Sequence, residues 1–249
     1  MPRKRQPLTL EHLALEAFGE CLKVIGRKMV ATIKRPDAPQ GHLILQLSLE
    51  YLNELIFESI PWYLYNKMSV QLLKATSELI KEIKETFVPS GPISTFINQM
   101  NIVVNLTEVA IHPCLTTIDI SHWPKIMRHV LYKTLPRMTG MEILNLGSGS
   151  GGWKTSDIEK SIISGVSNMK NLTRLCLCFD CTDHILNKVG DTCKNLQSLD
   201  VTSSRSVTDR SVSALTRCKR LKELHLYRTS ISTEGFAILL SNLPQLEDL

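Results

Sequence analysis

The chain has 249 residues, enough for one large domain or two small ones. It is 43% hydrophobic and 21% charged, which is ordinary globular usage and excludes a wholly disordered chain. The net charge of +5 is concentrated in residues 1–36, where eight Lys and Arg face three Glu. We interpret this basic tract, which includes Pro2-Arg3-Lys4-Arg5, as a solvated tail and helix face, and nucleic acid is not an expected partner.

Nothing in the sequence predicts a membrane or secretory protein. The most apolar stretch, residues 43–57, is too short and too often interrupted by polar residues to cross a bilayer. No apolar segment follows the basic N-terminal residues, as a secretory signal would require. The cysteine count of seven is odd, so reduced thiols are expected. We therefore predict a cytoplasmic or nuclear protein, or one present in both compartments.

Residues 1–90 are predicted to be helical. Thr9 is a plausible N-cap for a helix over residues 8–34, with Leu8 and Leu13 placed as a hydrophobic staple. A second helix is expected over residues 43–57, and a third from Ile60-Pro61 to about Phe87, closed by Val88-Pro89-Ser90-Gly91-Pro92. Residues 91–111 are read as a transition. The first helix carries one apolar stripe, formed by Leu10, Leu13, Ala14, Ala17, Phe18, Cys21 and Val24.

The second half of the chain is repetitive. Segments of the form L-x-x-L-x-L start at Leu172, Leu196 and Leu221, and a further copy begins at Leu246. Their starts are 24, 25 and 25 residues apart, a spacing typical of leucine-rich repeats. Earlier copies start at Met141 and Leu115, but Leu106 also fits, so the first strand stays open.

The repeat predicts one strand and one returning helix in each copy. Alternate strand residues point the same way, so the fourth and sixth positions of each segment should enter the core. The phrases at 206–209 and 231–234 each offer a Ser or Thr as a helix cap, with apolar residues following at helical spacing. We therefore predict an α/β fold, with a helical region before repeats that span residues 112–249. The repeats stop partway through a copy at Leu249, which predicts either a fragment of a longer repeat protein, the preferred interpretation, or one half of an end-to-end contact.

Cys193 and Cys218 each stand three residues before a predicted strand, and Val207-Thr208-Asp209 follows the strand between them. With the repeat, these residues resemble the cysteine-containing subclass of leucine-rich repeats. The resemblance covers roughly residues 112–249. It implies a right-handed α/β solenoid segment, a horseshoe whose sheet lines the concave side, with the thiols as small buried groups.

Two clusters suggest chemistry that we do not expect. Cys176, Cys178, Cys181 and His184 are metal-like in type, but Cys176 and Cys178 are predicted at outward strand positions and no second C-x-x-C accompanies them. The glycine-rich run 147–152 is followed by Trp153-Lys154-Thr155 rather than the Gly-Lys-Ser/Thr of a phosphate-binding loop, and is read as a flexible insertion. No cofactor, metal or catalytic constellation is predicted, and the chain is expected to be a non-catalytic recognition subunit.

Two short motifs in the helical region resemble adaptor-binding boxes. Residues 9–18 are similar to the elongin-binding BC box, although Ala14 stands where a cysteine is most typical, and residues 60–68 are similar to the cullin-2 box. In this order, ahead of leucine-rich repeats, they resemble the VHL-box substrate receptors of the Zyg type. The resemblance implies elongin B/C and cullin-2 as partners. The residues that it assigns to adaptor binding are Leu10, Ala14, Phe18, Ile60, Pro61, Leu64 and Met68.

The preferred function is therefore a substrate receptor of a cullin-RING ubiquitin ligase. The first alternative is an F-box-like receptor, in which Ile60-Pro61 would open the box and a Skp adaptor with its cullin would be the partners. The second is a leucine-rich scaffold unrelated to ubiquitin. The third is a nucleic-acid-associated factor that uses residues 2–35. The substrate is an unknown protein, expected on the outward strand positions with Tyr and Arg as anchors. These positions are Arg174, Cys176, Ser198, Asp200, Glu223, His225 and Tyr227.

Overall fold

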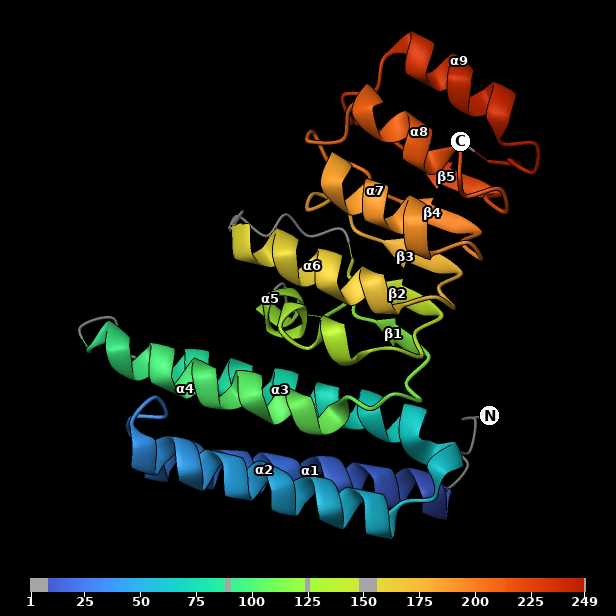
Figure 1. The fold of residues 1–249 in the computed structure, drawn as a ribbon. Helices are drawn as coiled ribbons and strands as arrows, with labels where there is room; N and C mark the ends of the chain where they lie inside the picture. The colour runs from blue at the N-terminus through green and yellow to red at the C-terminus, as the bar shows by residue number, and fades with distance from the viewer. Residues whose placement is uncertain (1–8, 88–90, 124–125, 148–155, 249) are drawn as a thin grey trace, which may run out of the picture. The chain divides into compact units, whose positions relative to one another are not determined.

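The computed structural model describes residues 9–87, 91–123, 126–147 and 156–248. It divides into two compact units, Met1–Ala110 and Ile111–Leu249, which we call unit 1 and unit 2. Unit 1 is helical and unit 2 combines helices with a parallel sheet, so the predicted α/β class with an N-terminal helical region is confirmed (Figure 1). The Pro2–Arg5 tract, the residues 88–90, most of the glycine-rich insertion (148–152) and Leu249 lie outside the described residues.

Unit 1 contains the three predicted helices. The first, α1 (Leu10–Thr32), begins after Thr9, whose hydroxyl accepts a hydrogen bond from the His12 amide at 3.2 Å, so the predicted cap is confirmed. The second, α2 (Pro39–Ser59), starts earlier than predicted because Pro39 suits the first helical turn. Pro61 caps the short 3₁₀ turn η1 (Trp62–Leu64), which leads into α3 (Tyr65–Thr86).

Two further elements close unit 1 where only a transition was predicted. These are α4 (Ile93–Leu106) and the 3₁₀ turn η2 (Thr107–Ala110). The alternative first strand at Leu106 is therefore wrong. Ile102, Val103 and Leu106 are all buried at helical spacing, and the L-x-x-V-x-I pattern that follows is a coincidence of a helix end.

Helices α1 and α3 pack side by side and run parallel. Ion pairs join Glu11 to Lys67, Lys23 to Glu78 and Arg27 to Glu82. Residue numbers therefore increase in the same direction along both helices. The buried face of α1 consists of Leu15, Gly19, Leu22, Gly26 and Met29. The glycines allow a close approach: a Cβ added at Gly26 would lie 2.6 Å from a Leu79 methyl carbon.

Unit 2 is built on a five-stranded parallel sheet in the order β1 to β5. The strands are β1 (Thr117–Asp119), β2 (Ile143–Asn145), β3 (Arg174–Cys176), β4 (Ser198–Asp200) and β5 (Glu223–His225). Each pairs with the next without a register shift between equivalent positions of the repeat. The predicted strands are confirmed, and Leu115 starts the first copy.

The helices of unit 2 form a second layer beside the sheet and stack in chain order (Figure 1). They are α5 (Ile126–Tyr132), η3 (Leu135–Arg137), α6 (Ser156–Asn168), α7 (Asp183–Thr192), η4 (Asp209–Ser211), α8 (Val212–Leu215) and α9 (Thr233–Asn242). Thr208 caps η4 and Ser232 caps α9 through their side chains, as predicted. The three apolar positions are buried in each of the five copies that contain β1 to β5; in the β4 copy, Leu196, Leu199 and Val201 are fully so.

Parallel pairing is also found after α9. Asp248 forms an isolated parallel bridge with Glu223, next to the copy that starts at Leu246. Among the described residues, no helix combines the length and the apolar character needed to span a bilayer.

Candidate functional site

The apolar stripe predicted on α1 faces solvent. An apolar helix stripe normally faces a core, yet Leu10 is 83% exposed, Leu13 48% and Val24 45%. We call this surface the outer face of α1; it comprises Leu10, Leu13, Ala14, Ala17, Cys21 and Val24, all exposed. Phe18, the remaining predicted member, is half-buried at its margin. Exposed apolar groups gathered on one helix face are typical of a protein-binding surface.

A second exposed apolar row lies on α2, and no motif in the sequence singles it out. Leu43, Leu47 and Tyr51 are all exposed, four residues apart on one side of the helix. Trp62 and Tyr63 in η1 are also exposed. The signal was present as a four-residue spacing, but the neighbouring buried residues Leu45, Leu52 and Ile56 mask it, because α2 is apolar on more than one side.

The seven residues assigned to adaptor binding are divided between exposed and buried positions. Leu10 and Ala14 are exposed on α1, and Pro61 is exposed before η1. Ile60 and Met68 are only 6% and 1% exposed, and Leu64 is half-buried. A side chain that is buried in its own chain must move before it can fill a partner's pocket. The first box is thus largely presented at the surface, whereas the second is largely buried.

In unit 2, the predicted substrate residues on the strands share the outward face of the sheet. The register places Arg174, Ser198 and Glu223 in one row, and Cys176, Asp200 and His225 in the next. Arg174 lies 3.7 Å from the Glu223 carboxylate. A hydrogen bond from Ser198 and the charge of Arg174 hold the pKa of Glu223 below its ordinary value. The first row therefore presents a charged surface.

The second row extends further than the sequence predicted. Asp119 and Asn145 continue it across β1 and β2. Asp119, Asn145 and Asp200 each accept a hydrogen bond at 2.9 Å from the backbone amide two residues later, which turns the chain out of the strand. The repeat register alone could have identified them, since they occupy the position of Asp200 in earlier copies.

Tyr227 lies just beyond β5 and is 67% exposed. The Arg228 guanidinium is 5.2 Å from the centre of its ring. With His225, Thr202 and Phe236, these residues line a cavity of about 490 Å³. An exposed aromatic ring beside an arginine is a common anchor in protein interfaces.

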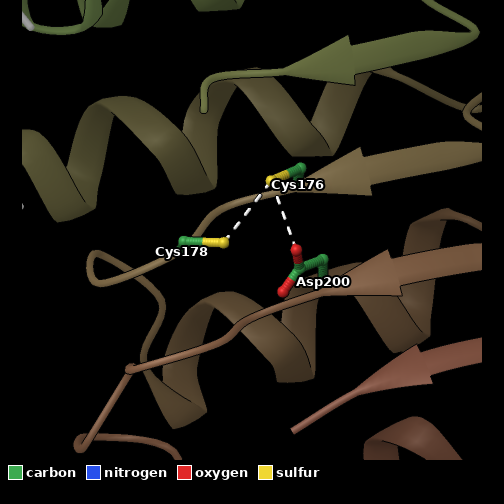
Figure 2. A group of neighbouring side chains, drawn as sticks. All are labelled: Cys176, Cys178 and Asp200. Carbon is green, nitrogen blue, oxygen red and sulfur yellow. Dashed lines mark hydrogen bonds between the residues drawn. The ribbon is translucent and has the colours of Figure 1, made fainter. Parts of the chain in front are cut away.

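The four residues of the metal-like sequence cluster are not brought together. Cys181 is buried and its thiol contacts the Thr182 carbonyl oxygen, while the exposed His184 lies 3.3 Å from Glu159. Cys178 is buried rather than outward as predicted, because it follows the end of β3 and turns inward. Instead, Cys176 and Cys178 gather with Asp200 of the next strand (Figure 2).

A buried ion pair supports the turn after β3. The Arg128 guanidinium of α5 contacts the Asp180 carboxylate at 3.2 Å and donates to the Cys178 carbonyl oxygen at 2.6 Å. Tyr132 donates to the same carboxylate at 2.5 Å, and burial raises the pKa of its hydroxyl. The sequence gives no sign of this network, because Arg128 and Asp180 lie in different copies of the repeat.

Comparison with known proteins gives a partial match. No family model matches the chain. A stretch of 71 residues is 41% identical to F-box protein SKIP1 from Arabidopsis thaliana. Part of this chain is similar to an F-box protein. The match covers 28% of this chain and 24% of that protein, so the chain spans about a quarter of its relative's length.

The match bears on the two resemblances drawn from the sequence. It is in line with the F-box alternative to the extent of these 71 residues. It offers no support for the VHL box or for elongin B/C. In the structure, the helical unit presents the outer face of α1 to solvent.

Proposed function

We propose that this chain is a leucine-rich-repeat substrate receptor of a cullin-RING ubiquitin ligase, held through a Skp-type adaptor. The observation that carries the proposal is the exposed apolar outer face of α1 in a chain that is partly similar to an F-box protein. Leucine side chains exposed to this degree lose contact with water when a partner covers them. Each stabilises a complex by about 1.5–3 kcal/mol when fully buried.

In this proposal, unit 2 is a solenoid segment and its outward sheet face holds the protein substrate. The in-register parallel strands and the stacked helices support a repeat architecture, in which each copy buries the apolar side of the last. The charged row of Arg174, Ser198 and Glu223 would bind polar or charged groups of the substrate, and Tyr227 would anchor the substrate. The chain would act by binding, with the chemistry performed elsewhere in the ligase.

Elongin B/C and cullin-2 are the second candidate partners. One observation favours them: Leu10 and Ala14, two of the three adaptor-binding residues assigned within the BC-like box, are exposed on α1. The buried Ile60 and Met68 weigh against the cullin-2 box. The partial F-box match leads us to prefer the Skp-type adaptor.

Binding of purified partners to the full chain tests the proposal. A Skp-type adaptor and elongin B/C are each titrated separately by calorimetry. Leu10→Ser and Leu13→Ser should weaken adaptor binding at least tenfold, since an apolar contact worth about 1.5 kcal/mol or more is lost. The matched control is Leu240→Ser, which removes a leucine 58% exposed on α9 in unit 2 and should leave adaptor affinity unchanged.

The outcomes separate the candidates. Binding of the Skp-type adaptor that depends on Leu10 and Leu13 supports the proposal. Binding of elongin B/C alone replaces the adaptor but keeps the ligase function. Binding of neither partner by well-folded wild-type protein would remove the link to ubiquitin and leave the repeat scaffold.

A further inference from the structure

Three potential metal ligands converge at the carboxyl ends of β3 and β4. The Cys176 sulfur lies 3.5 Å from the Cys178 sulfur and 3.8 Å from the nearer Asp200 carboxylate oxygen, and the three ligand atoms all lie within 4.8 Å of one another (Figure 2). Two thiolates bound to one tetrahedral Zn²⁺ at about 2.3 Å are separated by about 3.8 Å, and a thiolate and a carboxylate oxygen by about 3.5 Å. The two distances from the Cys176 sulfur are therefore close to two edges of such a tetrahedron.

We propose that Cys176, Cys178 and Asp200 form a binding site for a thiophilic divalent cation, with Zn²⁺ as the preferred ion. Two sulfur donors favour Zn²⁺ over Mg²⁺ and Ca²⁺, which select oxygen ligands. Three protein ligands leave the fourth position open. Because Cys176 and Asp200 are half-exposed on the outward face of the sheet, that position would be taken by water or by a donor from a bound molecule.

The backbone already holds the three ligands in place. One Asp200 oxygen, Oδ1, accepts the Thr202 amide at 2.9 Å, which leaves Oδ2 directed at the Cys176 thiol. The turn that carries Cys178 is fixed on both sides, because the Leu177 amide donates to the Asp200 carbonyl at 2.8 Å and the Phe179 amide donates to the Thr202 carbonyl at 3.0 Å. A preorganised site of this kind binds a metal with little reorganisation.

The charges around the cluster also suit a cation. The hydrogen bond from the Cys178 thiol lowers the pKa of Cys176. Binding of the cation displaces the Cys178 thiol proton, which is released to solvent. Arg128 is already paired with Asp180, so its positive charge does not stand alone beside the site.

No metal site was predicted from the sequence, because Cys176 and Cys178 were placed at outward strand positions and no second C-x-x-C accompanies them. Asp200 comes from the next copy, and the parallel register pairs it directly with Cys176. This inference does not rest on the proposed ligase function, since the site would form in any protein that folds this unit.

The test uses the full chain, reduced and stripped of metal by a chelator. Zn²⁺ is titrated by calorimetry, and Co²⁺ is added separately to detect thiolate-to-cobalt absorption. Cys176→Asn copies Asn145, which occupies the same position on β2 and closes its turn without a thiol. Asp200→Asn keeps the oxygen that accepts the Thr202 amide but removes the charge. Cys181→Ala is the control, because it removes a buried thiol outside the cluster.

We expect one Zn²⁺ per chain and a thiolate-to-cobalt band. Both ligand variants should lose more than the roughly 10–100-fold in affinity that outer-shell partners contribute, with unchanged circular dichroism, while Cys181→Ala should bind like the wild type. No binding by reduced wild-type protein would overturn the proposal. Wild-type affinity in Cys176→Asn and Asp200→Asn, or loss of binding in Cys181→Ala alone, would also overturn it.

Discussion

In unit 2, the leucine positions of every complete repeat are buried, whereas in unit 1 the apolar stripe of α1 faces solvent. The contrast has a structural cause. A strand in the repeat buries its alternate residues against its own returning helix and its neighbours. Helix α1 meets α3 through the side that contains Leu15, Gly19, Leu22, Gly26 and Met29, so the apolar residues on its other side, such as Leu10 and Leu13, remain exposed. Residues with the same hydrophobicity therefore stabilise the fold in one unit and are available for binding in the other.

The largest effect should come from a charge placed in the repeat core. Leu199→Asp buries a carboxylate where the native side chain has no exposure, with no cationic partner in the apolar layer. We expect loss of the folded state of unit 2, by more than about 4 kcal/mol, seen as a lost thermal transition. Gln197→Asp, on an exposed residue two positions earlier, is the control and should melt like the wild type.

A second pair of variants tests the orientation of α1. Leu15 is 6% exposed and Leu13 is 48% exposed, although they stand only two positions apart. Leu15→Ala should lower the free energy of unfolding by about 2–5 kcal/mol, because it leaves a cavity against α3. Leu13→Ala should change it by less than about 0.5 kcal/mol. Urea denaturation measures both values, and equal losses would mean that the two faces of α1 are assigned incorrectly.

The two glycines of α1 should respond in opposite directions to an added methyl group. A Cβ at Gly26 would lie 2.6 Å from Leu79 and 3.1 Å from Leu106, so Gly26→Ala should cost about 1–3 kcal/mol through overpacking. At Gly19 the nearest atom would lie 3.6 Å away. Gly19→Ala should therefore stabilise the helix by about 0.5–1 kcal/mol. Thermal melting measures both changes. Equal shifts in melting temperature for the two variants would rule out the close packing of α1 against α3 at Gly26.

The strands could be predicted because the repeat supplies the same information several times. The regular spacing of Leu172, Leu196 and Leu221 predicts a strand in each copy of the repeat. These strands could be predicted even though each is only three residues long. The helical unit has no such redundancy. Helix α4 was missed because its pattern ran into a chance L-x-x-V-x-I match, and the buried side of α1 was hidden because glycines carry no apolar signal.

The sequence predicted which kinds of surface the chain presents, but not all of the residues that form them. Outward strand residues such as Arg174 and Glu223 follow from alternation alone. The group of Cys176, Cys178 and Asp200 required the register between copies, which a search within one segment cannot provide. Burial of Ile60 and Met68 depends on packing between helices distant in sequence, which a short motif does not contain.

Amide hydrogen exchange of the full chain, with and without a purified Skp-type adaptor, tests the central claim most directly. If the outer face of α1 is the docking surface, adaptor binding should slow exchange along α1 from Leu10 to Val24 and leave α7 and α9 of unit 2 unchanged. Protection confined to unit 2, or an adaptor complex that leaves α1 exchange unaltered, would contradict the account.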